Sequence, residues 1–137
     1  MNKANWNLTQ DKIITKKQLN KLLKEMRAAM SAAILVKKDY KTINPFFIVS
    51  IAANTGLRIA ELSELTWDAI NLEEQYLIVK NGKGGKSRTV HFGDSTTEIF
   101  KDFRKKQREC FNRDCVGSEW IFKGQRGRLG VGGIHKI

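Results

Sequence analysis

The chain has 137 residues, which is enough for one domain and short for two. Hydrophobic residues make up 41% and charged residues 28%, so the composition supports a packed core and excludes wholesale disorder. Lysine and arginine number 25 against 14 acidic residues, and this net charge of +11 favours a polyanionic partner, most often nucleic acid, over a role in solubility alone.

The first predicted element is a helix that begins after a polar lead-in, residues 1–14. Thr15 and Gln18 have the spacing of a capping box, in which each side chain binds a free backbone amide of the other residue. Apolar residues then recur at helical spacing: Leu19, Leu22, Leu23, Met26, Met30 and Ala33. The intervening charges are mostly basic, so we expect this helix to dock one apolar stripe on the core.

A second helix is predicted to begin at Asn44 and Pro45, because proline is tolerated at the first helical position. The residues that follow are apolar almost all round: Phe46, Phe47, Ile48, Val49, Ile51, Ala52 and Ala53. This pattern indicates a helix buried on most sides. Gly56 is expected to end it.

A glycine bend and a shorter helix follow in residues 55–62, TGLRIAEL. They present Arg58 and Glu61 on one helical face, with Leu62 and Leu65 on another. Two interpretations fit the charged residues. They form either a surface ion pair worth roughly 0.2–0.5 kcal/mol, or a phosphate site in which Arg58 binds the anion with two hydrogen bonds and Glu61 supports the guanidinium.

Residues 76–81 and 87–92 are rich in β-forming side chains and are joined by a glycine-rich connector of hairpin length, residues 82–86. This segment has four basic residues and no acidic residue between them: Lys80, Lys83, Lys86 and Arg88. Such a charge favours phosphate contact over a merely solvated hairpin. Lys83 is either a solvated turn lysine or a proton donor to a departing oxygen. A P-loop is excluded, because Lys80 stands where its first glycine is required and a strand follows instead of a helix.

The last predicted helix opens at a second capping box, Ser95 with Glu98. One side of it is apolar (Ile99, Phe100, Phe103, Cys110 and Phe111), and the other side is basic (Lys101, Arg104, Lys105, Lys106 and Arg108). Residues 120–122 are a short apolar piece that can add a third strand. We interpret Trp67 and Trp120 as core residues and His91 as a polar residue on the open face of the hairpin.

The sequence gives little support for a metal, a cofactor or a membrane. Cys110 and Cys115 have only His91 and His135 as further soft ligands, too few for a convincing zinc site. No stretch approaches the ~20 apolar residues of a membrane span, and the first residues lack a signal-peptide core. We therefore expect a soluble, cytoplasmic protein without metal or cofactor.

Three stretches together resemble the catalytic domain of the tyrosine recombinase (phage integrase) family. They are residues 13–19, residues 55–70 (TGLRIAELSELTWDAI), which resemble the first arginine box, and residues 81–90 (NGKGGKSRTV), which resemble the hairpin with the catalytic lysine. Their order and spacing also match. The elements and the resemblance predict a mainly helical α+β fold, with helices around a small three-stranded antiparallel sheet in residues 15–137.

The resemblance implies a reaction on double-stranded DNA. The family cuts one strand with a tyrosine, forms a 3′-phosphotyrosine link, frees a 5′-hydroxyl and rejoins the strand to a partner duplex without metal or nucleotide. Arg58 would then clamp the scissile phosphate, Lys83 would be the general acid, and Glu61 would support the arginine. Lys86 and Arg88, with Lys80 beside them, would grip the DNA backbone. The complete enzyme would assemble as a tetramer on DNA.

The chain departs from the family pattern in its second half. The His-x-x-Arg box, the following His or Trp and the nucleophilic tyrosine are absent, since Tyr40 and Tyr76 both lie in the first half. We also expect these 137 residues to lack the family's N-terminal arm-like domain. We expect a partial catalytic domain that binds duplex DNA weakly and does not cleave it. The alternatives are a non-catalytic or regulatory relative that occupies recombination sites, and an unrelated basic helical protein.

Overall fold

The computed structural model describes residues 15–36, 40–80, 86–111, 120–124 and 127–129. The helices and strands of this part are α1 (Lys16–Ile34), α2 (Tyr40–Thr55), α3 (Ile59–Glu64), the 3₁₀ turn η2 (Trp67–Ala69), β1 (Ile70–Asn71), β2 (Tyr76–Lys80), β3 (Ser87–His91), α4 (Asp94–Phe111), β4 (Lys123–Gly124) and β5 (Gly127–Arg128). The predicted class is confirmed: the fold is mainly helical with a three-stranded antiparallel sheet in the order β1-β2-β3. None of the described helices combines the length and the hydrophobicity needed to cross a bilayer.

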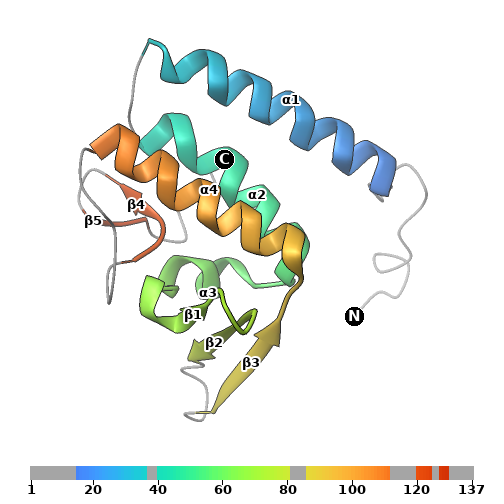
Figure 1. The fold of residues 1–137 in the computed structure, drawn as a ribbon, viewed down its shortest axis with the longest axis vertical. Helices are drawn as coiled ribbons and strands as arrows, with labels where there is room; N and C mark the ends of the chain where they lie inside the picture. The colour runs from blue at the N-terminus through green and yellow to red at the C-terminus, as the bar shows by residue number, and fades with distance from the viewer. Residues whose placement is uncertain (1–14, 37–39, 81–85, 112–119, 125–126, 130–137) are drawn as a thin grey trace, which may run out of the picture.

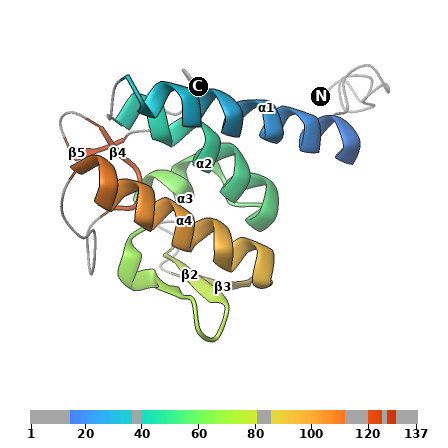
Figure 2. The ribbon, with the colours of Figure 1, turned by 45° about the horizontal axis from the view of Figure 1, so that its top comes forward.

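The helices are stacked on one side of the sheet. Helix α1 lies outermost with α2 beneath it in both views (Figures 1 and 2), and α4 packs against α2 and lies nearer to β2 and β3 in Figure 2. Aromatic side chains fill the space between α2 and α4, where the Phe47 and Phe103 rings stack with centroids 4.4 Å apart. Trp67 packs edge-on against Phe100 and is buried, as predicted. The core therefore lies between α2, α4 and the inner face of the sheet.

Helix α1 begins as its sequence predicts. The Gln18 amide N–H donates to Thr15 Oγ1 at 3.1 Å, and the Thr15 amide N–H donates to Gln18 Oε1 at 2.8 Å. Its apolar stripe is narrower than predicted, because Met30 is its one buried residue and Leu22 is 39% exposed. The capping residues set the start of this helix, but it buries little of its own surface.

The predicted start of α2 at Asn44 was wrong. The helix begins at Tyr40, and Pro45 lies inside it. The Ile43 side chain is fully buried, and Asn44 Nδ2 donates to the Lys123 carbonyl at 2.9 Å, so tertiary packing stabilises the turn before the proline. Pro45 is close to the helix start and removes only one backbone hydrogen bond. Gly56, with φ of 70°, follows the last helical residue as predicted.

The hairpin of β2 and β3 was predicted correctly, but the third strand was assigned to the wrong segment. It is β1, which pairs with the first residues of β2. Residues 120–122 lie instead beside the end of α3, where the Ile121 amide N–H donates to the Leu65 carbonyl at 2.9 Å. Trp120 forms an isolated bridge with Thr66 and is 42% exposed, so its assignment to the core was also wrong.

Helix α4 begins one residue before the predicted capping box. Asp94 is its first residue, and the Gly93 carbonyl accepts hydrogen bonds from the Thr97 amide at 3.1 Å and the Thr97 hydroxyl at 3.2 Å. Thr97 is buried, and its hydroxyl also accepts a hydrogen bond from Gln75 Nε2 at 3.2 Å. Phe100 and Phe103 are fully buried, which confirms the predicted apolar side of this helix.

Candidate phosphate-binding site

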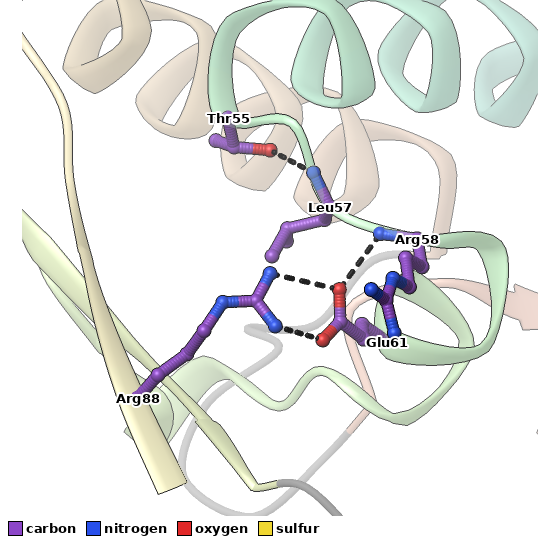
Figure 3. Close-up of polar contacts among 5 residues, drawn as sticks. All are labelled: Thr55, Leu57, Arg58, Glu61 and Arg88. Atoms are coloured by element: carbon purple, nitrogen blue, oxygen red, sulfur yellow. Dashed lines mark hydrogen bonds and ion pairs between the residues drawn. The ribbon is translucent and has the colours of Figure 1, made fainter.

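A hydrogen-bonded bend between α2 and α3 presents Arg58. The Thr55 hydroxyl donates to the Ile51 carbonyl at 2.6 Å and accepts the Leu57 amide N–H at 3.4 Å, and the Leu57 side chain is buried (Figure 3). Arg58 follows as the N-cap residue of α3 in an extended conformation, and it is exposed. The bend therefore holds a guanidinium group in solvent at the start of a helix.

The Arg58 guanidinium makes no hydrogen bond or ion pair with any other residue in the described part of the chain. The surface ion pair with Glu61, one of the two interpretations of the sequence, is thus not formed between the side chains. The Arg58 guanidinium is therefore left exposed to solvent beside the start of α3. The group is available to bind a phosphate with its two-pronged donor edge.

The Glu61 carboxylate is held by other donors. Its Oε1 accepts the Arg58 amide N–H at 2.8 Å and Arg88 Nη2 at 3.0 Å, and its Oε2 accepts Arg88 Nη1 (Figure 3). The Glu61 side chain is 11% exposed and that of Arg88 43%. The support that Glu61 gives Arg58 therefore runs through the Arg58 backbone, while its ion-pair partner is Arg88 in β3.

This ion pair shifts both acid–base equilibria. The hydrogen bond from Arg88 holds the pKa of the Glu61 carboxyl below its usual 4.5, against an opposing effect of burial, and the Arg58 amide adds to the lowering. The same bond raises the pKa of Arg88. Both groups are therefore charged at neutral pH, and the carboxylate is ionised in the immediate neighbourhood of Arg58.

The basic residues of the hairpin do not share one face. Arg88 pairs with Val79, which is buried, so Arg88 lies on the inner face of the ribbon. Lys80 and its partner Ser87 are exposed and lie on the outer face, since successive residues of a strand alternate. Lys86 is exposed just before β3. Lys83 lies outside the described residues.

Two other predicted positions can be placed. His91 is exposed on the outer face of β3, as expected, with its ring 6.2 Å from that of Tyr76. Cys110 is half-buried in α4, whereas Cys115 and His135 lie outside the described residues. Within the described ranges, no three His, Cys, Asp or Glu side chains are grouped so that they could hold a metal ion.

Comparison with known sequences identifies relatives over most of the chain. Residues 12–130 match the sequence profile of the phage integrase family. The tyrosine recombinase XerA of Pyrococcus furiosus is 30% identical over 99 residues, which are 72% of this chain and 30% of that protein. The tyrosine recombinase XerC of Pediococcus pentosaceus is 34% identical over 101 residues, 70% of this chain and 33% of that protein. The chain thus spans about a third of the length of these relatives.

Solved structures show the same fold. A crystal structure of XerA recombinase superposes with a TM-score of 0.64 at 22% identity, covering 95% of this chain and 41% of that one. The Tn1549 transposon integrase in complex with transposon right end DNA gives a TM-score of 0.61 at 18% identity, covering 97% of this chain and 45% of the integrase. At these identities the likeness concerns the fold alone.

Proposed function

The chain belongs to the phage integrase family of tyrosine recombinases, and on that premise we propose that it forms the part of a recombinase catalytic domain that holds the DNA phosphate at the strand to be cut. The observation that carries this proposal is the exposed Arg58 guanidinium, which has no partner among the described residues. A guanidinium group is suited to the charge that develops on the non-bridging oxygens of a phosphodiester.

The other site residues have roles in this proposal that agree with their positions. Lys80 and Lys86 are exposed at the base of the hairpin loop and would contact neighbouring phosphates. Lys83 would be the general acid to the leaving 5′-oxygen. Glu61 fixes the start of α3 through the Arg58 amide. The solved complexes of the Tn1549 integrase with DNA support double-stranded DNA as the partner.

The attacking tyrosine is not part of this proposal. Of the tyrosines in the chain, Tyr76 lies in β2 beside His91, at the end of the ribbon away from the loop, and Tyr40 is the first residue of α2. We propose that residues 15–137 act as one partial catalytic domain, which binds duplex DNA but does not cleave it. In the complete recombinase, the nucleophile would act on the phosphate that Arg58 holds, in a cytoplasmic tetramer assembled on DNA.

The test is equilibrium binding of the 137-residue chain to a short duplex at low salt, measured by fluorescence anisotropy. Arg58→Met is expected to lower the affinity on the order of tenfold, because it removes a charged hydrogen-bond donor from the phosphate. Lys24→Met removes the same charge from an exposed position in α1 and is expected to have a smaller effect. Equal losses for the two variants would mean that Arg58 supplies only diffuse charge.

A nicked duplex tests the absence of cleavage. Incubation with this substrate, in which the released piece of strand diffuses away and traps the intermediate, is expected to leave free protein and free DNA on a denaturing gel. A covalent protein–DNA adduct would contradict the proposal that this chain lacks the nucleophile.

A further inference from the structure

The Glu61 carboxylate lies near two arginines at the start of α3, and Arg88 is the one that bonds it through its side chain. Resting on the function proposed above, we propose that Arg88 is a positioning residue: by occupying the Glu61 carboxylate, it keeps Arg58 available for a phosphate. Arg88 would then act without touching DNA. This role differs from direct contact with the DNA backbone, which is the role that the charge of Arg88 alone suggests.

The contacts show that Arg88 engages the carboxylate as fully as one side chain can. Its two terminal nitrogens donate to the two Glu61 oxygens, the two-pronged geometry in which an arginine–carboxylate pair is strongest. The Arg58 amide adds a third hydrogen bond to Oε1. Together these donors fix the direction in which the carboxylate points. In Figure 3, Arg88 approaches it from one side, while the Arg58 side chain lies on the other.

Without Arg88, the Glu61 carboxylate would have Arg58 as its alternative partner. Arg58 is the extended N-cap residue of α3, and its own amide already bonds the Glu61 carboxylate, so the two side chains start from neighbouring points. The positive charge of Arg58 already contributes to the lowered pKa of Glu61. A carboxylate and a phosphate compete for the same donor edge of a guanidinium. An Arg58 paired with Glu61 would therefore bind DNA less well.

The same ion pair joins two parts of the proposed site. Arg88 pairs with Val79, and the next pair, Lys80 with Ser87, is the last one before the loop that contains Lys83. Glu61 lies in the first turn of α3, next to Arg58. The ion pair thus ties the base of the hairpin to the helix that presents the arginine. The position of Arg88 on the inner face of the ribbon brings its side chain to Glu61, although 43% of that side chain is exposed.

A double-mutant cycle on the 137-residue chain tests the proposal, with duplex DNA as the probe. Arg88→Met alone is expected to weaken binding about tenfold, comparable to losing the Arg58 contact. In the Glu61→Gln background the same substitution is expected to change affinity little, because no carboxylate remains to capture Arg58. A direct contact between Arg88 and DNA would give the same loss in both backgrounds, and that result would overturn the proposal.

Lys86→Met is the matched control, since it removes a nearby exposed charge from the same hairpin. Lys86→Met is expected to lower the affinity for DNA by the same factor in the wild-type chain and in the Glu61→Gln background. A Lys86 loss that also vanished in the Glu61→Gln background would overturn the specific role of Arg88. Thermal unfolding followed by circular dichroism verifies that each variant is folded.

If Arg88→Met does not fold, Arg88→Lys replaces it, because lysine keeps the charge but not the two-pronged geometry. A loss with this variant that disappears in the Glu61→Gln background supports the proposal, and a loss that persists contradicts it. Arg58→Met distinguishes a failure of the proposed function from a failure of the positioning role of Arg88. If it leaves affinity unchanged, the proposed function fails; if it lowers affinity while the Arg88 loss is the same in both backgrounds, only the positioning role fails.

Discussion

Glu61 takes part in two interactions that depend on its negative charge, one with Arg88 and one with the Arg58 amide. The ionised carboxylate accepts all three hydrogen bonds, and they disfavour its protonation in the folded chain. The residue is therefore a structural element of the site whose contribution changes with pH. It also lies too deep to be a simple surface charge, with 11% of its side chain exposed.

This dependence gives a prediction for acid unfolding. Because the folded pKa of Glu61 lies below the unfolded value, the ion pair contributes stability that is fully present above about pH 4.5 and is lost as the pH falls through the folded pKa. We expect the free energy of unfolding, measured by urea titration at a series of pH values, to fall more steeply with acid in the wild type than in Glu61→Gln. Parallel curves would show that the ion pair adds nothing to stability.

At the scale of the elements, the bend between α2 and α3 decides where Arg58 lies. Gly56 adopts a φ of 70°, in the left-handed region that side chains with a Cβ rarely occupy, although an added Cβ would meet no atom within 4 Å. Gly56→Ala is therefore expected to destabilise the chain by about 1 kcal/mol through backbone strain alone. Urea unfolding provides the measurement.

Gly93→Ala serves as the control for this prediction. An added Cβ at Gly93 also meets no atom within 4 Å, and its backbone is outside the strained region. We expect a smaller loss of stability there. Equal losses at the two glycines would mean that strain at the bend is not what sets the position of Arg58.

Local signals in the sequence predicted the elements that depend on local contacts. The start of α1 follows from Thr15 and Gln18, which bond each other, and the end of α2 follows from the conformational freedom of Gly56. The β2–β3 hairpin follows from two β-rich runs and a glycine-rich connector. In each case the residues that decide the structure are neighbours in the chain, so their spacing was sufficient.

The predictions from sequence were wrong where contacts between residues far apart in the chain determine the local structure. The turn before Pro45 is held by Asn44, whose side chain binds the carbonyl of a residue 79 positions away. Residues 120–122 lie beside α3 and outside the three-stranded sheet. They are held there by hydrogen bonds with the Leu65 carbonyl and with the buried Gln107, which donates to the Ile121 carbonyl at 2.7 Å. Helical periodicity and strand propensity contain no information about such partners.

The same reasoning applies to the site. Arg58 was identified from its motif, but the partner of Glu61 was expected to be the Arg58 side chain, three residues away. The partner in the structure is Arg88, which is 27 positions distant and in another element. One signal was present: an arginine opposite a buried valine in a hairpin needs an acceptor on the inner face. That signal becomes readable only once the register of the two strands is known.

At the scale of the whole molecule, the part of the chain that carries Arg58 has a core of its own. Phe47, Phe103 and Phe122 pack around the contact between α2 and α4, and the fold agrees with that of XerA recombinase at a TM-score of 0.64. The surface carries a formal charge of +11. The proposed DNA binding of a molecule with this charge would involve many weak contacts, so one affinity value would not isolate the contribution of Arg58.

The dependence of DNA affinity on salt concentration tests the central claim, that Arg58 binds a backbone phosphate, most directly. Each phosphate contact contributes about 0.9 to the slope of log affinity against log salt concentration. We predict that Arg58→Met makes this slope shallower by about one unit. Arg58→Lys should keep the slope while lowering the affinity, because the charge remains and the two-pronged geometry is lost. An Arg58→Met slope equal to that of the wild type would contradict the account.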